Sequence, residues 1–411
     1  MTVLFWIIVS ILTVDFLSER YLDYLNTTRW SNRLPEEVRG IYDEDKYRRQ
    51  QDYAKANHRF SMLTSAFSFI LILLMLFFQG FALIHHWAVS ITDSPAGSAL
   101  LFFGILMLAS DLLHTPFELY DTFVIEEKFG FNRTSLKTFV LDKLKSWLLG
   151  AFIGGGLLTL IIRIWSATGK DFWLYAWLVV SVFSLFMLLF YSSLIVPLFN
   201  KQRPLEEGML KEAIRNFATK AGFRLENIYV IDGSKRSTKA NAYFSGMGTK
   251  KRIVLYDTLI RDMDISELIA VLAHEIGHYR KKHVYQSLFL GIVQTGLMLY
   301  LFSLFTESPD LSAALGVSQP AFHLALTAFG ILYSPLSALI GLGMNYLSRQ
   351  NEYEADAYAA SHANGQALAG ALKKLSVKNL SNLRPHPAYV FVHYSHPTLL
   401  QRLKALKAFS P

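Results

Sequence analysis

No cysteine occurs in the sequence of 411 residues, and only 18% of its residues are charged. The lack of cysteine excludes disulfides, thiolate metal sites and a thiol nucleophile, so a protein-bound metal must be held by His, Asp or Glu. The shortage of charge accompanies a hydrophobic content of 52% and an aromatic content of 14%. A water-soluble domain of this length does not need so much apolar material, so the composition favours an integral membrane protein.

Seven apolar segments separate the charged stretches, and we predict that each is a helix that crosses a bilayer. The first and third are short and contain Asp15 and Asp111. No basic residue precedes the first segment and no small-residue cleavage site follows it, so we interpret it as an uncleaved span rather than a signal peptide. The predicted spans are Val3–Leu17, Phe60–Ile84, Ala99–Leu113, Trp147–Ile162, Phe172–Pro197, Ser287–Phe305 and Ala321–Leu347.

Basic residues are distributed unevenly among the connecting loops, and this distribution predicts the topology. Loops after the first, third, fifth and seventh segments contain 38 of the 40 Lys and Arg residues, and the opposite loops contain only Arg163 and Lys170. Because cytoplasmic loops are enriched in basic residues, we expect the N-terminus outside and the C-terminus on the cytoplasmic side. The net charge of +8 therefore reflects topology in a bacterial inner membrane or an endoplasmic reticulum membrane, and nucleic acid is not an expected partner.

Residues 1–199 are expected to form a membrane domain of five spans, and residues 200–411 a second domain with two further spans. The second domain is predicted to begin with an amphipathic helix over about 205–221 and to continue with a helix from Ser266. Its C-terminal stretch is predicted to be helical, with a turn at 384–387. Three short runs between the two helices have strand-like composition and predict a small sheet: Asn227–Ile231, Ala240–Phe244 and Arg252–Tyr256.

The helix from Ser266 contains the motif His274-Glu275-Ile276-Gly277-His278. Residues four apart share one helical face, so the imidazoles of His274 and His278 can bind one ion. A zinc ion lowers the pKa of its water to about 7, and a neighbouring carboxylate can accept the proton. The motif therefore predicts a catalytic site for one Zn²⁺ per chain, with Glu275 as the general base. His283, five residues further on, is expected at the membrane edge rather than on the metal.

A catalytic zinc site needs a third protein ligand, and the acidic segment after the last apolar run offers one. Glu352 and Asp356 are four residues apart and share a helical face, whereas Glu354 points away from it. We therefore expect Glu352 to be the third ligand and Asp356 to accept a hydrogen bond from an imidazole N–H.

Motifs spread over most of the chain resemble those of the CAAX prenyl protease type 1 family, whose members are multispanning zinc metallopeptidases with seven spans. Beyond the HEIGH motif and Glu352-x-x-x-Asp356, four segments carry this resemblance: 122–132 (TFVIEEKFGFN), 241–246 (NAYFSG), 252–259 (RIVLYDTL) and 395–402 (SHPTLLQR). The resemblance implies an α-helical integral membrane protein of about seven transmembrane helices with a gluzincin-type zinc metallopeptidase domain that contains a small β-sheet.

The resemblance also implies roles for residues outside the metal motif. His396 and Arg402 would stabilise the charge that develops on the substrate carbonyl oxygen, and Asn241, Ala242 and Tyr243 would form an edge strand that binds the substrate backbone. The implied substrate is a prenylated chain that loses its last three residues. Two alternatives stay open: quality control of membrane proteins, as in the shorter HtpX-type proteases, and a non-proteolytic transport or clearance component. Retention of Glu275 and all three ligand residues favours an enzyme.

Overall fold

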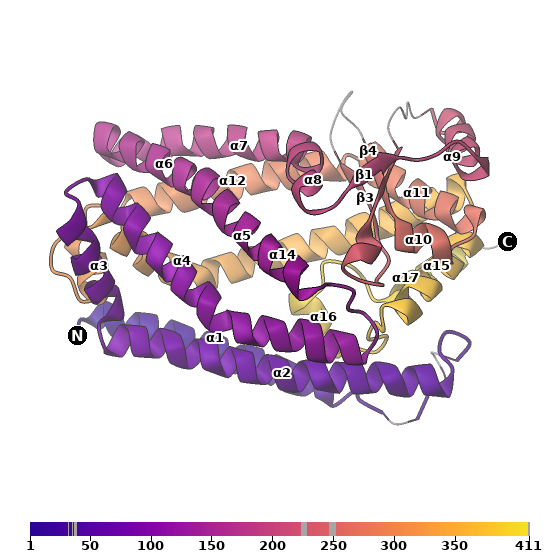
Figure 1. Ribbon diagram of the computed structural model, residues 1–411, viewed down its shortest axis with the longest axis horizontal. Helices are drawn as coiled ribbons and strands as arrows, with labels where there is room; N and C mark the ends of the chain where they lie inside the picture. Colours follow the sequence, from indigo (N-terminus) through magenta and orange to yellow (C-terminus); the bar gives the residue numbers. More distant parts are fainter. Residues whose placement is uncertain (32, 35, 37–38, 223–227, 246–251, 410–411) are drawn as a thin grey trace.

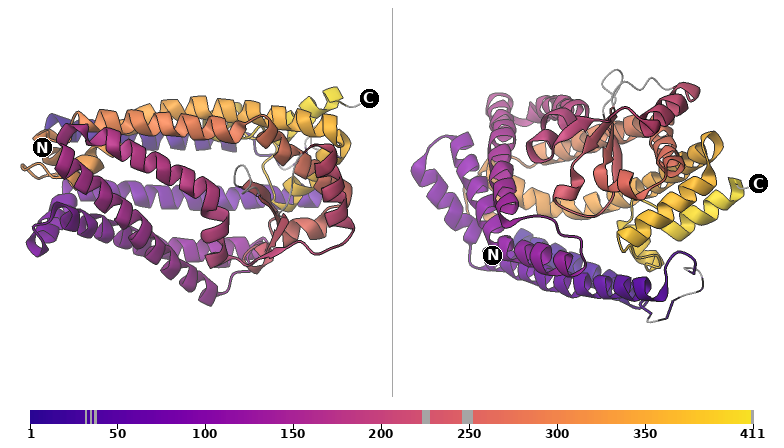
Figure 2. Two further views of the ribbon diagram at one scale, coloured as in Figure 1. Left: turned by 90° about the horizontal axis from the view of Figure 1, so that it is seen from above. Right: turned by 45° about the vertical axis from the view of Figure 1, so that its right-hand side comes forward.

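Long helices run side by side along most of the molecule, and the sheet with several shorter helices lies at one end (Figure 1; Figure 2). The computed structural model describes residues 1–31, 33, 34, 36, 39–222, 228–245 and 252–409, and it does not describe the side chains of residues 244 and 245. Asn227 of the first predicted strand and Gly246 of the 241–246 motif lie outside the described residues.

All the secondary-structure elements of the N-terminal half in the described part of the chain are helices, joined by short connections. Two segments are π-helical: η2 continues α4, and η3 joins α5 to α6. The elements are α1 (Val3–Thr27), α2 (Glu44–Phe77), α3 (Gly80–Ile91), α4 (Pro95–Tyr120), η2 (Asp121–Glu126), α5 (Leu136–Leu149), η3 (Gly150–Gly154), α6 (Gly155–Thr168), η4 (Gly169–Asp171), α7 (Phe172–Leu194) and α8 (Val196–Phe199).

Five helical stretches of the described chain are long and apolar enough to cross a membrane: Glu44–Phe77, Pro95–Glu126, Leu136–Phe199, His283–Ser303 and Phe322–His362. The third has 64 residues and contains two predicted segments, one in η3–α6 and one in α7–α8, which run back along each other (Figure 1). The five stretches thus contain most of the residues of six of the seven predicted spans. The first predicted span lies in α1, a helix of 25 residues that packs against α2 and α14.

The second predicted span has the wrong boundary. The apolar run 60–84 is not one helix, because α2 ends at Phe77 and α3 begins at Gly80. Gln79 lies between them in the left-handed region, with φ of 54°. An apolar run does not reveal such a break, because backbone direction here depends on one residue rather than on hydropathy.

Asp111, the charged residue of the third apolar segment, is paired. The Nζ of Lys143 on α5 lies 2.7 Å from Oδ2 of Asp111 and 2.9 Å from Oε2 of Glu118, both on α4. The indole N–H of Trp147 donates to the same Asp111 oxygen at 3.1 Å. An unpaired charge in the hydrocarbon layer is costly, so this cluster explains how a span that contains Asp111 is tolerated.

The second half begins with a four-stranded sheet of order β1-β2-β4-β3. β2 and β4 are parallel, and the two outer pairs are antiparallel. β4 has the predicted limits, β3 begins two residues later than predicted, and β1 was not predicted because three residues ending in proline carry little strand signal. The elements are β1 (Gln202–Pro204), α9 (Met209–Lys220), β2 (Ile228–Ile231), η5 (Gly233–Lys235), β3 (Ala242–Ser245) and β4 (Arg252–Tyr256).

The helix with the HEIGH motif, α11 (Ile265–Arg280), is buried between the sheet and α14 (Phe322–His362). It starts one residue before the predicted Ser266, because Asp264 and Glu267 form a capping box. Leu272 and Ile276 on α11 share a buried apolar core with Ile253 and Leu255 of β4. The remaining elements are α10 (Asp257–Asp262), α12 (His283–Ser303), α13 (Pro309–Ala314), α15 (Gly365–Lys378), α16 (Pro387–His393), α17 (Leu399–Leu406) and η7 (Lys407–Phe409).

Candidate metal centre

Close contact between α11 and α14 brings the two predicted ligand segments together. A Cβ added at Gly277 would lie 3.1 Å from the Cα of Ala355 and 3.1 Å from the Cβ of Tyr358. A larger residue at Gly277 would therefore hold the helices apart. Glycine here allows α11 to approach α14 until the side chains of the two helices can share one ion.

His274, His278 and Glu352 form the group that the sequence predicts, and their ligand atoms all lie within 4.8 Å of one another. The Nε2 atom of His278 is 3.2 Å from Nε2 of His274 and 3.2 Å from Oε1 of Glu352. His274 and Glu352 are buried, with 7% and 4% of their surfaces exposed. Glu275 is half-buried on the same helix between the two histidines.

These side chains fit a metal ion. Oε2 of Glu352 is buried and forms no hydrogen bond; its polar neighbours are Nη1 of Arg402 at 3.3 Å and Nε2 of His274 at 3.5 Å, and an ion held by the group would satisfy this oxygen. Two imidazole nitrogens and one carboxylate are the donor set of a catalytic zinc site that keeps a fourth position open. The absence of cysteine leaves this nitrogen and oxygen set as the chemically suitable one.

Asp356 accepts the hydrogen bond expected from an imidazole. Its Oδ1 lies 2.9 Å from Nδ1 of His274, so it can fix the tautomer and orientation of that ring. Arg402 on α17 binds the same carboxylate through two nitrogens, at 2.6 and 2.8 Å. Burial disfavours the charged form of Arg402, but the ion pair with Asp356 outweighs burial and raises the pKa of Arg402 above its ordinary value.

His396 lies at the rim of the cluster, in the loop between α16 and α17. Its Nε2 is 3.3 Å from Oε1 of Glu352, and 63% of its side chain is exposed. Its Nδ1 is 2.9 Å from the hydroxyl of Ser395. The exposed ring can therefore meet a molecule that enters the site from solvent. Arg402, whose side chain is only 12% exposed, is occupied by Asp356 and lies 3.3 Å from Glu352.

The structure gives His283 a place that the sequence did not predict. Its Nδ1 lies 3.0 Å from Nδ1 of His278, and its Nε2 lies 3.5 Å from Glu354. Lys282, with φ of 62°, turns the chain between α11 and α12 and so brings His283 back against the motif helix. Spacing along one helix could not reveal this contact, because it depends on that turn. The side chain of Glu354 is half exposed and does not belong to the group of His274, His278 and Glu352.

Asn241, Ala242 and Tyr243 lie at the outer edge of the described sheet. β3 pairs only with β4 among the described strands, so its other side is a free edge, and it also contacts α11. The carbonyl of Asn241 accepts a hydrogen bond from the N–H of Tyr256 at 3.1 Å. Ala242 and Tyr243 thus lie in the outermost described strand, and Asn241 directly precedes it.

Lys239, just before β3, ties this edge to the membrane helices. Its Nζ lies 2.8 Å from Oε2 of Glu126 in η2 and 3.0 Å from the hydroxyl of Tyr53 in α2. Burial disfavours the charged form, but these partners outweigh it and raise the pKa of Lys239 above its ordinary value. The placement of β3 thus depends on residues from the other half of the chain.

Comparison with known proteins agrees with this geometry. Residues 23–201 match the family model described as CAAX prenyl protease N-terminal, five membrane helices, and residues 204–410 match peptidase family M48. CAAX prenyl protease 1 of Saccharomyces cerevisiae is 36% identical, over 95% of this chain and 92% of its own. The human CAAX prenyl protease 1 homolog is 32% identical, over 95% of this chain and 92% of its own.

A solved structure agrees over nearly the whole fold. The crystal structure of Ste24p from S. mikatae superposes with a TM-score of 0.92 at 35% identity and covers 99% of each chain. The buried His-His-Glu group and these matches lead to one conclusion: the chain belongs to the M48 family of metallopeptidases and resembles the CAAX prenyl protease 1 proteins along almost its entire length.

Proposed function

We propose that this membrane metallopeptidase removes the last three residues of chains that carry a prenylated C-terminal cysteine, with one Zn²⁺ held by His274, His278 and Glu352. The His-His-Glu group, in which His274 and Glu352 are buried and His278 is partly buried, is the observation that carries the proposal. The names of the similar proteins support the substrate class. Zinc suits a site of two imidazoles and a carboxylate, the gluzincin type of donor set.

A zinc ion bound there would lower the pKa of a water to about 7 and polarise the scissile carbonyl. Glu275 then acts as the general base: its carboxylate accepts a proton from the attacking water and later delivers it to the leaving nitrogen. Its place between the two ligand histidines on α11 keeps it beside the reacting atoms without taking a ligand position.

His396 donates a hydrogen bond to the carbonyl oxygen of the substrate as negative charge develops on it. The exposed ring at the rim of the cluster suits this role. Arg402 was expected to share it, but its guanidinium is already bound to Asp356. We therefore assign Arg402 to the positioning of Asp356 and Glu352, and through Asp356 of the His274 ring.

Asn241, Ala242 and Tyr243 hold the substrate backbone by adding it as a strand to the free edge of β3. Such main-chain pairing binds an extended peptide with little regard for its side chains. The bonds of Lys239 to Tyr53 and Glu126 hold the start of β3 in place. This matters for the reaction, because a shift of β3 would move the scissile bond of a substrate paired with it away from Glu275.

We also propose that the chain crosses the membrane seven times, with α1 as the first span, and that it divides near residue 200 into a five-span domain and a metallopeptidase domain. The two family matches, which end at residue 201 and begin at residue 204, support the division. The uneven distribution of Lys and Arg supports a cytoplasmic position for the zinc site and the C-terminus.

One experiment tests the substrate. Purified full-length protein is incubated with a farnesylated peptide and with the same peptide unmodified, and the cleavage sites are mapped by mass spectrometry. We expect one cut, three residues from the C-terminus, in the farnesylated peptide only, and none with the Glu275→Gln variant. Equal cleavage of both peptides at scattered positions would instead indicate a general protease of membrane proteins.

A further inference from the structure

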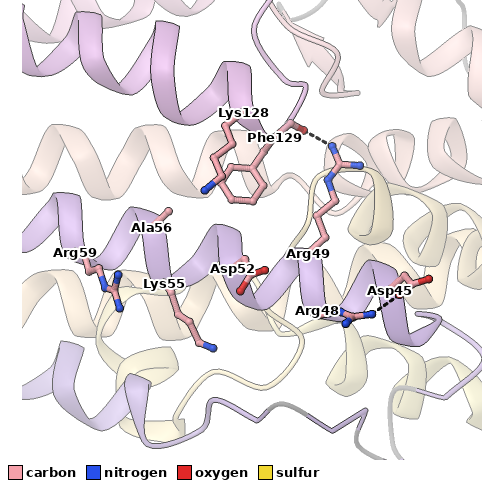
Figure 3. A pocket seen from close by; sticks show the side chains of 9 residues that line it. All are labelled: Asp45, Arg48, Arg49, Asp52, Lys55, Ala56, Arg59, Lys128 and Phe129. Carbon is pink, nitrogen blue, oxygen red and sulfur yellow. Dashed lines mark hydrogen bonds and ion pairs between the residues drawn. The ribbon is translucent and has the colours of Figure 1, made fainter.

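A cleft with an excess of positive charge lies away from the metal centre, between α2 and the segment that follows η2 (Figure 3). Its volume is about 560 Å³, within the roughly 300–1,000 Å³ of small-molecule sites. The cationic side chains that line it outnumber the acidic ones, five to two. The cationic residues are Arg48, Arg49, Lys55, Arg59 and Lys128, and the acidic ones are Asp45 and Asp52.

Helix geometry explains the row of charges on one wall. Along α2 the lining residues recur every three or four positions from Asp45 to Arg59, with an adjacent pair at 48–49 and another at 55–56, so they form one stripe along the helix. At 1.5 Å per residue, the stripe from Arg48 to Arg59 is about 16 Å long. Figure 3 shows Lys128 and Phe129 facing this stripe from the neighbouring segment.

The acidic side chains do not neutralise the whole stripe. Arg48 pairs with Asp45 at the far end of the cleft, where both side chains are largely exposed. Arg49 donates to the carbonyl of Phe129 at 2.5 Å, which joins the two walls and does not cancel its charge. Arg59 and Lys128 are exposed on opposite walls, and neither forms an ion pair with any carboxylate in the described part of the chain.

The cleft lies where two candidate spans leave their apolar sequence. The apolar part of α2 begins directly after Arg59, and Lys128 follows the stretch Pro95–Glu126. From the cleft, α2 runs towards the opposite end of the molecule, where α3 connects it to α4, and α4 runs back towards the cleft (Figure 1). The headgroups of lipids that lie against α2 and α4 are therefore expected at the same depth in the membrane as the cleft.

We propose that this cleft binds the phosphate-bearing headgroup of an anionic phospholipid. Basic pockets at the cytoplasmic ends of membrane helices recognise such headgroups, and each Lys or Arg near the surface contributes binding. Arg59 and Lys128 contact the phosphate that links headgroup and glycerol, because they lie nearest to the apolar sequence. Arg49, further along the stripe, reaches a phosphate on the headgroup itself, so a phosphoinositide binds more tightly than phosphatidylserine.

Native mass spectrometry of the full-length protein in detergent tests this proposal. The added lipids are phosphatidylinositol 4,5-bisphosphate, phosphatidylserine and phosphatidylcholine, and separate samples receive free inositol phosphate or inorganic phosphate. We expect the phosphoinositide to be retained most and phosphatidylcholine least, with affinity falling as salt increases. The double variant Arg59→Gln, Lys128→Gln should bind the phosphoinositide roughly tenfold more weakly or worse.

A matched control removes two positive charges outside the cleft: Lys46→Gln, on α2 in an exposed pair with Asp43, together with Lys220→Gln at the end of α9. We expect this variant to bind as the unchanged protein does. If both double variants bind the phosphoinositide equally weakly, or if the protein shows no preference for anionic lipids, the cleft is not a lipid-binding site. Binding of inositol phosphate or inorganic phosphate as tight as that of the lipid overturns the assignment to a membrane headgroup in favour of a soluble phosphate.

Discussion

Glu275 differs from its neighbours in the motif because its proposed role does not include metal binding. We predict that Glu275→Gln abolishes peptide cleavage but leaves about one zinc per chain. The substitution removes the base and keeps the shape of the side chain, while His274, His278 and Glu352 are untouched. Metal analysis of the purified variant checks this prediction. Loss of zinc from the variant would mean that Glu275 belongs to the coordination sphere.

His396 makes a separate prediction about the reacting carbonyl. A hydrogen bond that strengthens only as negative charge develops on the substrate oxygen affects the rate of the chemical step more than the binding of the substrate. His396→Ala should therefore lower kcat by about 10²–10³ with little change in KM and with zinc retained. Steady-state kinetics on the prenylated peptide provide the measurement. A zinc-loaded variant with unchanged kcat would leave His396 only a structural part in the loop between α16 and α17.

His283 contacts a ligand histidine from outside the metal group, at 3.0 Å from Nδ1 of His278. Partners of this kind orient the ligand, and their loss costs roughly 10–100-fold in metal affinity. We predict a weakening of this size for His283→Ala in competition with a zinc chelator. Glu354→Ala is the matched control, because Glu354 is 3.5 Å from His283 and half of its side chain is exposed. Equal affinity in His283→Ala and the unchanged protein would contradict the positioning role.

At the scale of elements, the distance between α11 and α14 determines whether the metal group can form. We predict that Gly277→Ala destabilises the fold by roughly 1–3 kcal/mol, because the new methyl group meets the backbone of Ala355 at 3.1–3.2 Å and the helices must separate. The same separation should weaken zinc binding. Thermal unfolding with and without added zinc measures both effects.

Gly291→Ala is the control for this substitution, because Gly291 lies in the helix α12 and a Cβ there has open space around it. Alanine favours a helix over glycine, so this variant should be as stable as the unchanged protein or slightly more so. A Gly277→Ala protein that matches it in stability and zinc affinity would show that α11 and α14 tolerate a wider spacing.

Contacts within one helix were predictable from the sequence, and contacts that depend on chain reversals were not. The spacing of His274 and His278, and of Glu352 and Asp356, fixes which side chains share a face, and elimination of cysteine restricted the donor set. In contrast, His283 reaches His278 through a left-handed residue at Lys282. Resemblance to a known family, not spacing, brought His396 and the edge strand into the prediction.

At the scale of the whole molecule, the break at Gln79 shows the limit of hydropathy. A run of apolar residues gives the presence of a membrane segment, but it does not say where the backbone turns. The stretch Leu136–Phe199 is the opposite case: it reverses direction around Gly169, within the short loop that Arg163 and Lys170 mark in the sequence. Turns of this kind decide which loops share a side of the membrane, so topology needs its own test.

The absence of cysteine makes that test direct, because a single introduced thiol is the only one in the protein. Asp93 lies between α3 and α4, at the end of the molecule opposite the sheet, and Lys220 ends α9 beside the sheet (Figure 1). Both are exposed, so Asp93→Cys and Lys220→Cys should leave the fold intact.

We predict that a membrane-impermeant maleimide labels the two variants from opposite sides of the membrane, with Lys220→Cys reactive from the cytoplasm. The loop at Asp93 has no Lys or Arg between residues 85 and 98, whereas the region around Lys220 is the most basic of the chain, and this contrast determines the sign of the prediction. Labelling of both variants from one side would require an even number of spans between them and would refute the proposed topology.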